Sequence, residues 1–418
     1  MKVVILGGGV VGATAAYELQ KDGHDITLVE RHAAVAEDTS WGNAGMVAPG
    51  HSFAWSSPQA PFILAKSLIQ GGQSLRYKPR LSARQWRWSL DFLRECTKAR
   101  STANTQRKYA IASYSQKVLQ ETIDATGIEY DRVTRGILYF YRTPSRLTAG
   151  IEHMQIMERM GQRVEVLDRN EVLQLEPALA GAANGLVGGV YCPTDETGSC
   201  NKFSVGLARH ISAKGGTLRF GETILKIETK GDRVTGVITN KGRIEADIYI
   251  MALGQESRDL AASIGEKLRI YPIKGYALTI PVGKSPLPPT IGAVDEENLV
   301  AVSPLGDQVR VTATAEISDD SRSFKPSDFT HMAKIARETY PQGALHDRAK
   351  QWAGLRPMTP TNLPIIGRKN YSNLYYDTGH GHIGWTMSHG SARILADVIA
   401  GRQPALPLAE INDMGAEH

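Results

Sequence analysis

Cysteine is scarce in this chain, which has three cysteines, Cys96, Cys192 and Cys200, in 418 residues. No two of them form a C-x-x-C pair, and no cluster of cysteine and histidine has the spacing of a zinc site. We therefore expect neither a disulfide framework nor a bound metal. Sparse, unpaired cysteine is typical of the reducing cytoplasm, which is where we expect the protein.

Long apolar runs and low-complexity tracts are also missing. No segment reaches the ~18 uninterrupted apolar residues that a membrane-spanning helix needs. The apolar N-terminus is broken by glycines and lacks a small-residue cleavage site, so we interpret it as a buried strand and a loop, not as a signal peptide. Without a repeat of solenoid period, a chain of this length is expected to form two or three domains, or one large two-part domain.

Charge of one sign is not spread over the chain. The net charge is +5, but residues 76–108 alone hold ten basic and two acidic residues, so the remainder is slightly acidic. This distribution argues against a nucleic-acid partner. Within the basic segment, residues 81–100 predict a helix with apolar side chains at helical spacing: Trp86, Leu90 and Leu93, widened by Trp88 and Phe92. Two interpretations stay open: a peripheral contact with the inner face of the cell membrane, or a surface helix whose tryptophans face the core.

The N-terminus carries a dinucleotide-binding pattern. Residues 2–6 form a short apolar run typical of a buried parallel strand, and Gly7, Gly9 and Gly12 follow directly. The first glycine permits a sharp turn, the second lets the backbone approach a pyrophosphate, and the third lets the next helix pack closely on the strand. The pyrophosphate then lies at the helix N-terminus, where free N–H groups favour an anion.

An acidic residue completes this pattern. Glu30 ends a second predicted strand over 26–29, where its carboxylate can accept hydrogen bonds from both ribose hydroxyls. A carboxylate at this position disfavours a 2′-phosphate, so NADP is not expected.

Three further segments favour FAD over NAD. The loop T-S-W-G-N-A-G at 39–45 offers backbone N–H groups and the Ser40 and Asn43 side chains to a flat ring, although an ordinary turn has the same pattern. Residues 233–254 predict a strand, a turn and a buried strand that ends at Gly254. The glycine-rich run at 379–385 precedes a long amphipathic helix, whose start can stabilise negative charge on a reduced flavin.

Longer motifs carry a resemblance to one family. They are G-I-E-Y-D-R-V-T-R-G at 127–136, P-T-D-E-T-G at 193–198, Y-P-I-K-G-Y at 271–276, G-L-R-P-M-T-P at 354–360 and N-L-Y-Y-D-T-G-H-G-H-I-G-W-T-M at 373–387. On these residues the chain resembles the D-amino acid dehydrogenase small subunit along nearly its whole length. That family lies within the superfamily of D-amino acid oxidase and glycine oxidase.

The resemblance implies a fold of class α/β plus α+β. It consists of a glutathione-reductase-like, FAD-binding Rossmann domain and a discontinuous substrate domain built on an antiparallel sheet. We expect the FAD-binding domain at 1–55, 198–262 and 348–406, the substrate domain at 56–197 and 263–347, and a C-terminal tail at 407–418.

The resemblance also implies that FAD is bound non-covalently. The residues expected to contact it lie in the glycine-rich segments and at the ends of the neighbouring strands: Gly7, Gly9, Val10, Val11, Gly12, Glu30, Arg31, Ser40, Asn43, Ala44, Gly45, Met46, Gly254, Gly379, Gly381, His382, Ile383, Gly384, Trp385 and Thr386.

The chain departs from the family pattern in segments expected to face the flavin. The family usually has Gln at the position of Met46, Thr at that of His382 and often Tyr at that of His51, and it usually has Asp at that of Thr361. These departures leave the reaction as expected but put the substrate in question. A cyclic imino acid such as D-hydroxyproline is one specialisation that we consider.

Four residues are candidates for substrate chemistry. Arg356 is the first, because a guanidinium binds a carboxylate through two parallel hydrogen bonds. Tyr276, on a predicted strand, offers a hydroxyl to the same carboxylate. His382 and His51 are candidates to take the proton that a substrate ammonium loses before hydride leaves. For each, a structural role is the alternative: a salt bridge for Arg356, an edge strand for Tyr276 and a local hydrogen bond for either histidine.

The resemblance implies oxidation of a D-amino acid or D-imino acid, with the hydride passing from Cα to flavin N5 and the electrons on to a quinone or another respiratory acceptor. Two alternatives remain: an oxygen-using amine oxidase of the glycine or sarcosine type, and a non-catalytic FAD-binding subunit of a larger complex. The sequence does not decide the side-chain preference, the physiological acceptor or the oligomeric state.

Overall fold

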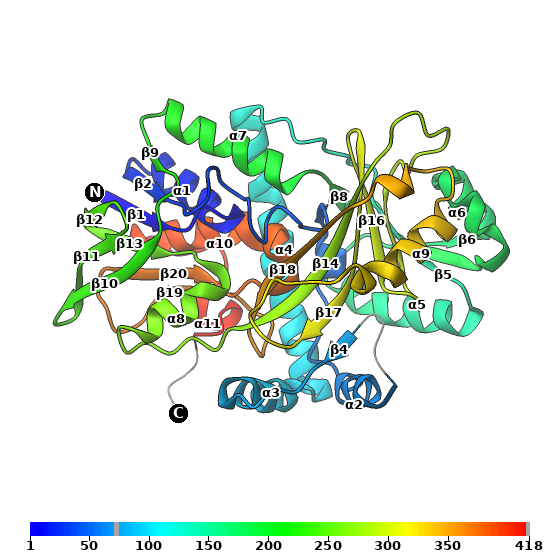
Figure 1. Cartoon of the computed structure of the whole chain (residues 1–418), viewed down its shortest axis with the longest axis horizontal. Helices are drawn as coiled ribbons and strands as arrows, with labels where there is room; N and C mark the ends of the chain where they lie inside the picture. The colour runs from blue at the N-terminus through cyan, green and yellow to red at the C-terminus, as the bar shows by residue number, and fades with distance from the viewer. Residues whose placement is uncertain (71–74, 415–418) are drawn as a thin grey trace.

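The computed structural model describes residues 1–70 and 75–414. The chain folds around two main sheets, which lie at opposite sides of the molecule in Figure 1. The first has the order β19-β20-β13-β1-β2-β9. All its neighbouring strands are parallel except β19 and β20. Its strands are β1 (Lys2–Leu6), β2 (Asp25–Val29), β9 (Thr217–Arg219), β13 (Ile248–Met251), β19 (Ile365–Arg368) and β20 (Leu374–Thr378).

Both faces of this sheet are covered. Val3 and Ile5 of β1 pack on the helices α1 (Val10–Lys21), α4 (Lys98–Thr126), α7 (Cys200–Ala213) and α10 (Gly384–Ile399). Val4 and Leu6 pack instead on a three-stranded antiparallel sheet of β10 (Ile224–Lys230), β11 (Arg233–Thr239) and β12 (Gly242–Ile244). Successive side chains of a strand point to opposite faces, so a continuous apolar run is what this position requires. The expected Rossmann-type domain is confirmed.

The second sheet is larger and mainly antiparallel. Its order is β18-β14-β17-β16-β15-β5-β7-β6, with β4 added beside β17. The β15–β5 and β17–β4 pairs are parallel. Its strands are β4 (Leu75–Tyr77), β5 (Ile137–Tyr141), β6 (Glu165–Asp168), β7 (Gly188–Cys192), β14 (Tyr271–Pro281), β15 (Gly292–Asp295), β16 (Val300–Leu305), β17 (Gln308–Ile317) and β18 (Lys350–Met358). This is the expected antiparallel-sheet domain.

Shorter elements connect and cover these sheets. The helices are α2 (Ala60–Gln70), α3 (Ala83–Glu95), α5 (Pro144–Arg159), α6 (Arg169–Leu175), α8 (Ser257–Ala262), α9 (Thr330–Thr339) and α11 (Leu408–Ile411). A two-stranded ladder joins β3 (Met46–Val47) to β8 (Glu196–Thr197). The 3-10 turns are η1 (Pro49–His51), η2 (Pro177–Gly185), η3 (Gly254–Glu256), η4 (Pro326–Phe329), η5 (His346–Arg348) and η6 (Gly381–Ile383).

The strand pairing moves two of the expected domain boundaries. We placed 348–358 in the FAD-binding domain, but β18 pairs with β14 and forms the edge of the large sheet. We treated 407–418 as a tail, but Ile411 is buried in the same core as α1 and α10, and the Asn412 amide exchanges hydrogen bonds with Ile366. Both differences have the same cause, because a local sequence pattern does not show which distant segments will pack against each other.

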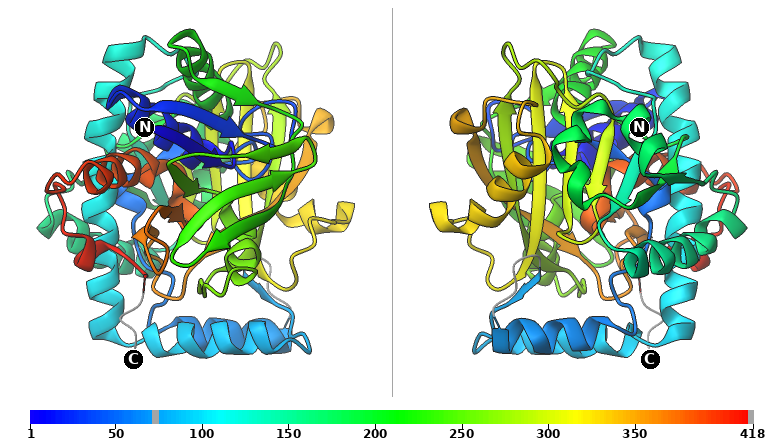
Figure 2. Two further views of the ribbon diagram at one scale, coloured as in Figure 1. Left: turned by 90° about the vertical axis from the view of Figure 1, so that its left-hand side faces the viewer. Right: turned by 90° about the vertical axis from the view of Figure 1, so that its right-hand side faces the viewer.

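Helices α2 and α3 lie together at one end of the molecule, below both sheets in Figures 1 and 2. On α3 the tryptophans separate. Trp88 is buried with Phe92 against β14 and β17, and its indole N–H donates to the carbonyl of Met358 at 2.9 Å. Trp86 points outward and is 49% exposed. Within the described ranges, none of the helices combines the length and hydrophobicity that crossing a bilayer requires.

Candidate active site

A cavity of about 1130 Å³ lies between the two main sheets. Its wall is formed by the N-terminal glycine turn, the 39–46 loop, residues 252–256, strand β18 and the 377–386 segment. Most of the segments that we expected to meet FAD or substrate therefore share one chamber, although they are far apart in the sequence.

Two glycines of the turn, Gly7 and Gly12, have no room for a larger side chain. Gly7 has φ +105°, and a β-carbon there would lie 2.7 Å from the carbonyl oxygen of Ala252. A β-carbon on Gly12 would lie 1.9 Å from the carbonyl oxygen of Gly7. Ser40 accepts a hydrogen bond from the N–H of Val10 at 3.1 Å, which places the 39–46 loop against the start of α1. The turn therefore exposes backbone where a pyrophosphate would bind, as FAD requires.

Glu30 lies at the end of β2, on the wall of this cavity. Its carboxylate accepts hydrogen bonds from the N–H of Gly8 at 2.7 Å and the N–H of His32 at 2.9 Å. These contacts hold it beside the glycine turn, where the ribose of a bound nucleotide would lie. Arg31 follows and forms ion pairs with Asp38 and Glu256 at the same edge of the cavity.

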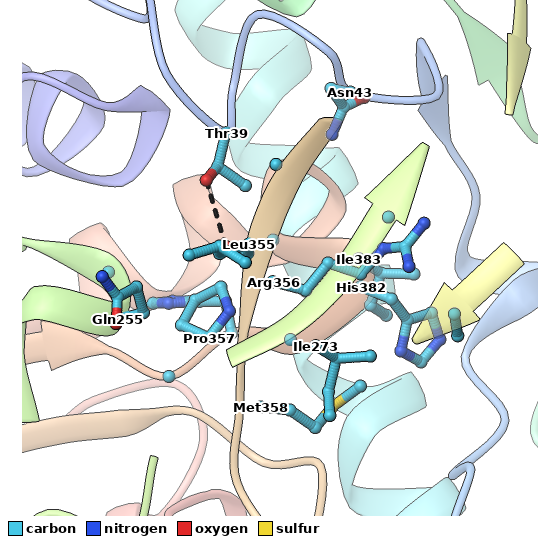
Figure 3. Close-up of a pocket in the computed structure, with 18 of the residues that line it drawn as sticks. Thr39, Asn43, Gln255, Ile273, Leu355, Arg356, Pro357, Met358, His382 and Ile383 are labelled. Carbon is cyan, nitrogen blue, oxygen red and sulfur yellow. Dashed lines mark hydrogen bonds between the residues drawn. The ribbon is translucent and has the colours of Figure 1, made fainter. Parts of the chain in front are cut away.

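Arg310, which the sequence did not single out, holds the 39–46 loop in place. Its guanidinium donates to the carbonyls of Trp41 at 2.8 Å and Asn43 at 2.9 Å, and it lies 5.0 Å from the Trp41 ring centroid. The Thr39 hydroxyl also donates to the carbonyl of Leu355 at 3.0 Å, as Figure 3 shows. Arg310 stands on β17, far from the loop in the chain, so only tertiary folding reveals this role.

The C-terminal glycine-rich segment forms the opposite wall. Gly379 has φ +78° and Gly381 φ +62°, and a β-carbon on Gly381 would lie 2.8 Å from the sulfur of Met358. No side chain caps the start of α10. The Thr386 hydroxyl receives a hydrogen bond from the N–H of Ala48 at 3.2 Å, which fixes the Met46 strand to this helix start. Free N–H groups at a helix start fit the negative edge of a reduced flavin.

Not every predicted FAD contact presents its side chain to the cavity. The indole of Trp385 is buried in the core beside Tyr130 and Phe203, although the residue borders the cavity. The Asn43 side chain accepts a hydrogen bond from the N–H of Gly45 at 2.8 Å, which shapes the loop itself. The remaining predicted contacts line the cavity except Gly12 and Gly45, whose lack of a side chain allows close backbone packing. Together these residues fit an FAD molecule.

Arg356 crosses from β18 toward β14 in the cavity wall. A β-carbon on Gly275, its neighbour on β14, would lie 2.5 Å from the Arg356 Cζ, so this glycine makes the room for the guanidinium. Arg356 donates to the carbonyl of Thr314 at 3.4 Å and lies 5.7 Å from the Trp55 ring centroid. It forms no ion pair with any carboxylate of residues 1–70 or 75–414. Burial lowers the pKa of its guanidinium to about 10. Arg356 is thus a half-buried cation on the cavity wall, placed to bind an anionic ligand.

His382 and His51 meet beside Arg356. Figure 3 shows the Arg356 guanidinium and the His382 ring next to each other beside β14. The His382 ring stacks on Trp55 with centroids 4.4 Å apart and lies 6.2 Å from His51, edge to face. Burial, and then the positive charge of Lys108, lowers the pKa of both imidazoles, to about 4 for His51. Both are therefore neutral at neutral pH.

Lys108 is a second residue that the sequence did not indicate. It stands on α4 behind His382, and its side chain is completely buried. Its Nζ lies 3.1 Å from Nε2 of His382. In the sequence, the only indication of this residue would have been a lysine among the apolar positions of one helix face.

Tyr276 borders the same cavity, but its hydroxyl is directed away from Arg356 toward another side chain. Its hydroxyl donates to Glu316 at 3.1 Å, and its ring packs edge to face on Phe329 within the core of the large sheet. The structure therefore brings Arg356, His382 and His51 together and gives the Tyr276 hydroxyl a structural partner.

The sequence model of the family described as FAD-dependent oxidoreductase, DAO, matches residues 2–398. The chain belongs to the DAO family of FAD-dependent oxidoreductases. It is thus an FAD enzyme. The residues described above form a site that fits its flavin.

The relatives of this DAO-family chain have names that are more specific than the family description. The chain is 43% identical over 407 residues to "D-amino acid dehydrogenase 2" of Mesorhizobium japonicum, covering 97% of this chain and 98% of that protein. It is 40% identical over 411 residues to a D-amino acid dehydrogenase of Bradyrhizobium diazoefficiens, covering 98% of both chains. Among solved structures, a glycine oxidase from Geobacillus kaustophilus matches with a TM-score of 0.76 at 21% identity, covering 98% of this chain and 97% of that one. That likeness concerns the fold alone.

Proposed function

We propose that this chain oxidises the bond between Cα and nitrogen of a D-amino acid or of a cyclic D-imino acid such as D-hydroxyproline. FAD supplies the acceptor for the hydride that leaves Cα, at flavin N5. An acyclic imino product then hydrolyses to a 2-oxo acid and ammonia. The proposal extends to this chain the activity that names its relatives of 43% and 40% identity.

The observation that carries the proposal is the half-buried guanidinium of Arg356, which lines the cavity. A partly desolvated cation with no carboxylate partner among the described residues is unfavourable unless a ligand supplies the opposite charge. A substrate carboxylate does so and accepts two parallel hydrogen bonds from the guanidinium fork. This contact would fix the orientation of Cα in the chamber that also holds the predicted flavin segments. Trp55 supplies a flat apolar wall below it.

His382 and His51 supply the second requirement of the reaction. A substrate ammonium has no lone pair, so it must lose a proton before hydride can leave Cα. A neutral imidazole accepts a proton, and both rings are held neutral by burial and by nearby positive charge. His382 lies beside Arg356, so it is our first choice for the base.

A panel of anaerobic titrations tests this function. Purified holoenzyme is mixed with D-amino acids, cyclic D-imino acids, their L-enantiomers, glycine and sarcosine, and flavin bleaching is followed. Bleaching by D-enantiomers alone supports the proposal. Bleaching by glycine derivatives alone would indicate a glycine or sarcosine type oxidase, and no bleaching with any of them would indicate a non-catalytic FAD-binding subunit.

We further propose that the electrons pass to a quinone at a membrane surface. The support is an apolar and basic surface on α2 and α3. Phe62, Ile63 and Leu68 of α2 and Trp86, Leu90 and Leu93 of α3 are all exposed, and Arg84, Arg87 and Arg94 lie on the same α3 helix. Figures 1 and 2 show both helices at the same end of the molecule. Tryptophan and leucine next to arginine suit the interface of an anionic bilayer.

Two measurements test the acceptor and the surface. A quinone analogue should reoxidise the reduced enzyme much faster than oxygen does, and rapid peroxide formation would favour an oxidase. The enzyme should sediment with vesicles that contain phosphatidylglycerol. Replacing Trp86, Leu90 and Leu93 together by serine should abolish sedimentation while the flavin content stays unchanged.

A further inference from the structure

The cavity of the candidate active site opens to solvent beside α2. Four residues line the cavity and are also exposed: Gln59 just before α2, Ile63 on α2, Lys98 at the start of α4 and His153 on α5. The His153 ring stacks on Phe53, in the segment that leads into α2, with centroids 3.7 Å apart. We call this part of the wall the α2 opening. The residues that fit the nucleotide form another part of the wall, so bound FAD would leave the α2 opening to other molecules.

Inside the α2 opening, the cavity wall is apolar. Side chains of two helices belong there to one apolar cluster, and all of them line the cavity: Ala60 and Leu64 of α2 and Trp88 and Phe92 of α3. Trp55 packs against the same cluster, and its ring centroid lies 5.7 Å from Cζ of Arg356. An apolar passage between α2 and α3 therefore connects the α2 opening with the predicted substrate end of the cavity.

The apolar surface continues on the outside of α2. Ile63 is 46% exposed, and Phe62 and Leu68 on the same helix are 78% and 52% exposed. Figures 1 and 2 show α2 at the end of the molecule where α3 also lies. Exposed apolar side chains that gather on one face mark a contact with an apolar partner. Because Ile63 belongs both to this face and to the cavity wall, an apolar ligand can extend from the surface into the passage.

This continuity selects a class of ligand. A zwitterionic amino acid gains nothing from such a path, because its charged groups lose hydration against apolar walls. A lipid quinone gains from it along its whole length, since it combines a flat ring with a long hydrocarbon tail. A quinone is also an acceptor for two electrons, which is the number that each oxidised amine releases.

We propose that the α2 opening is the port for a lipid quinone. The quinone ring enters the apolar passage between α2 and α3, and its tail leaves over Ile63 onto the outer face of α2. The substrate amine loses two electrons and two protons in each turnover, and the quinone takes up the same number to become a quinol, so no further reactant is needed. This inference rests on the proposed function, in which a quinone is the acceptor, and it adds the route and the residues that form it.

The test compares two quinones in detergent solution without vesicles, so that docking to a membrane plays no part. Holoenzyme is reduced anaerobically with one equivalent of dithionite, and flavin reoxidation is followed with decyl-ubiquinone and with the same ring lacking the tail. In wild type we expect a clearly lower half-saturating concentration for the quinone with the tail.

Ile63→Ser and Leu68→Ser form a matched pair of variants. Both remove an exposed aliphatic side chain from α2, but within the described part of this helix Ile63 lines the cavity and Leu68 does not. Ile63→Ser should raise the half-saturating concentration of decyl-ubiquinone about 3- to 10-fold, as expected when the tail covers half of an isoleucine side chain. Leu68→Ser should leave this concentration unchanged, and the quinone without a tail should hardly distinguish the three proteins.

Two results would overturn the port. One is equal half-saturation by the two quinones in wild type, and the other is an equal effect of Ile63→Ser and Leu68→Ser. Either result, with rapid reoxidation by both quinones, would keep the quinone as acceptor and reject this route.

The use of dithionite separates this inference from the proposed function. No amino acid takes part, so an enzyme that shows the expected tail dependence but ignores D-amino acids would keep the port and lose the proposed substrate. Failure of both quinones to reoxidise the flavin would reject the acceptor and the port together and leave amine oxidation standing.

Discussion

Replacing Arg356 by alanine should weaken substrate binding far more than FAD binding. The structure supplies the reason. The guanidinium is half-buried on the cavity wall, partial burial lowers its pKa, and it has no carboxylate partner within the described residues. Part of the unfavourable desolvation of this charge is therefore already present before substrate arrives, and the substrate carboxylate would restore the charge balance.

The magnitude follows from buried charge pairs. Truncating one partner of a desolvated, hydrogen-bonded pair costs about 2–5 kcal/mol. At about 1.4 kcal/mol per tenfold change, this corresponds to a rise of roughly 30-fold to several thousand-fold in half-saturating substrate. Arg356→Lys should recover only part of this, because an ammonium keeps the charge but loses the planar fork.

Gly275 offers an independent perturbation of the same contact. An alanine there would place its β-carbon 2.5 Å from Cζ of Arg356, and the φ of Gly275 lies outside the left-handed region, so the backbone accepts the change. The guanidinium must then move. Gly275→Ala should raise half-saturating substrate in the same direction as Arg356→Ala, with the arginine still present.

The assay is the substrate concentration that gives half-maximal flavin reduction in wild type, Arg356→Ala, Arg356→Lys and Gly275→Ala, with FAD content measured in parallel. An amine that lacks the carboxylate serves as the control, and its half-saturation should hardly change. Normal FAD content together with an unchanged half-saturation in Arg356→Ala would remove this residue from the substrate site.

Three further predictions concern the cofactor site, stability and α3. Gly12→Ala should abolish FAD retention, since its β-carbon would meet the Gly7 oxygen at 1.9 Å; an apo-to-holo titration that still saturates would contradict this. Burial raises the pKa of Asp195 from 3.8 to about 8, so its protonation stabilises the fold most below pH 4, and this contribution is lost as pH rises to 8. Asp195→Asn should therefore flatten the fall in unfolding free energy between pH 5 and 8, measured by urea denaturation, and an unchanged slope would refute the assignment. Trp88→Ala should lower the unfolding free energy by about 3–5 kcal/mol, whereas Trp86→Ala, at an exposed position, should change it by less than about 0.5 kcal/mol in the same urea experiment.

Local patterns in the sequence were enough to predict the FAD-binding half. The apolar run of β1, the glycine spacing and the acid at the end of β2 each act over a few residues, because a tight turn and a helix start depend on nearby backbone atoms. The same is true of the glycine-rich start of α10. The resemblance then supplied the antiparallel sheet of the second domain, which the structure contains as expected.

Contacts between distant segments were decided only by the tertiary structure. The pairing of β18 with β14 placed Arg356 over Gly275, and the reach of Arg310 from β17 held the loop at Trp41 and Asn43. Neither has a local signature, because each depends on which strands become neighbours. The direction of a strand side chain also depends on register, and it turned the Tyr276 hydroxyl to Glu316.

The burial of individual side chains was the property that the amino-acid sequence predicted least well. Residues 76–108 appear as one basic segment, yet Trp88 faces the core, Trp86 faces solvent and Lys108 is completely enclosed beside His382. A lysine has the same formal charge in any sequence, but its proton affinity depends on the dielectric and the charges that surround it after folding. The sequence and the resemblance predicted the cofactor and the segments expected to contact it. The neutral or charged state of the groups at the substrate end arose only when α4, η1, β18 and η6 packed together.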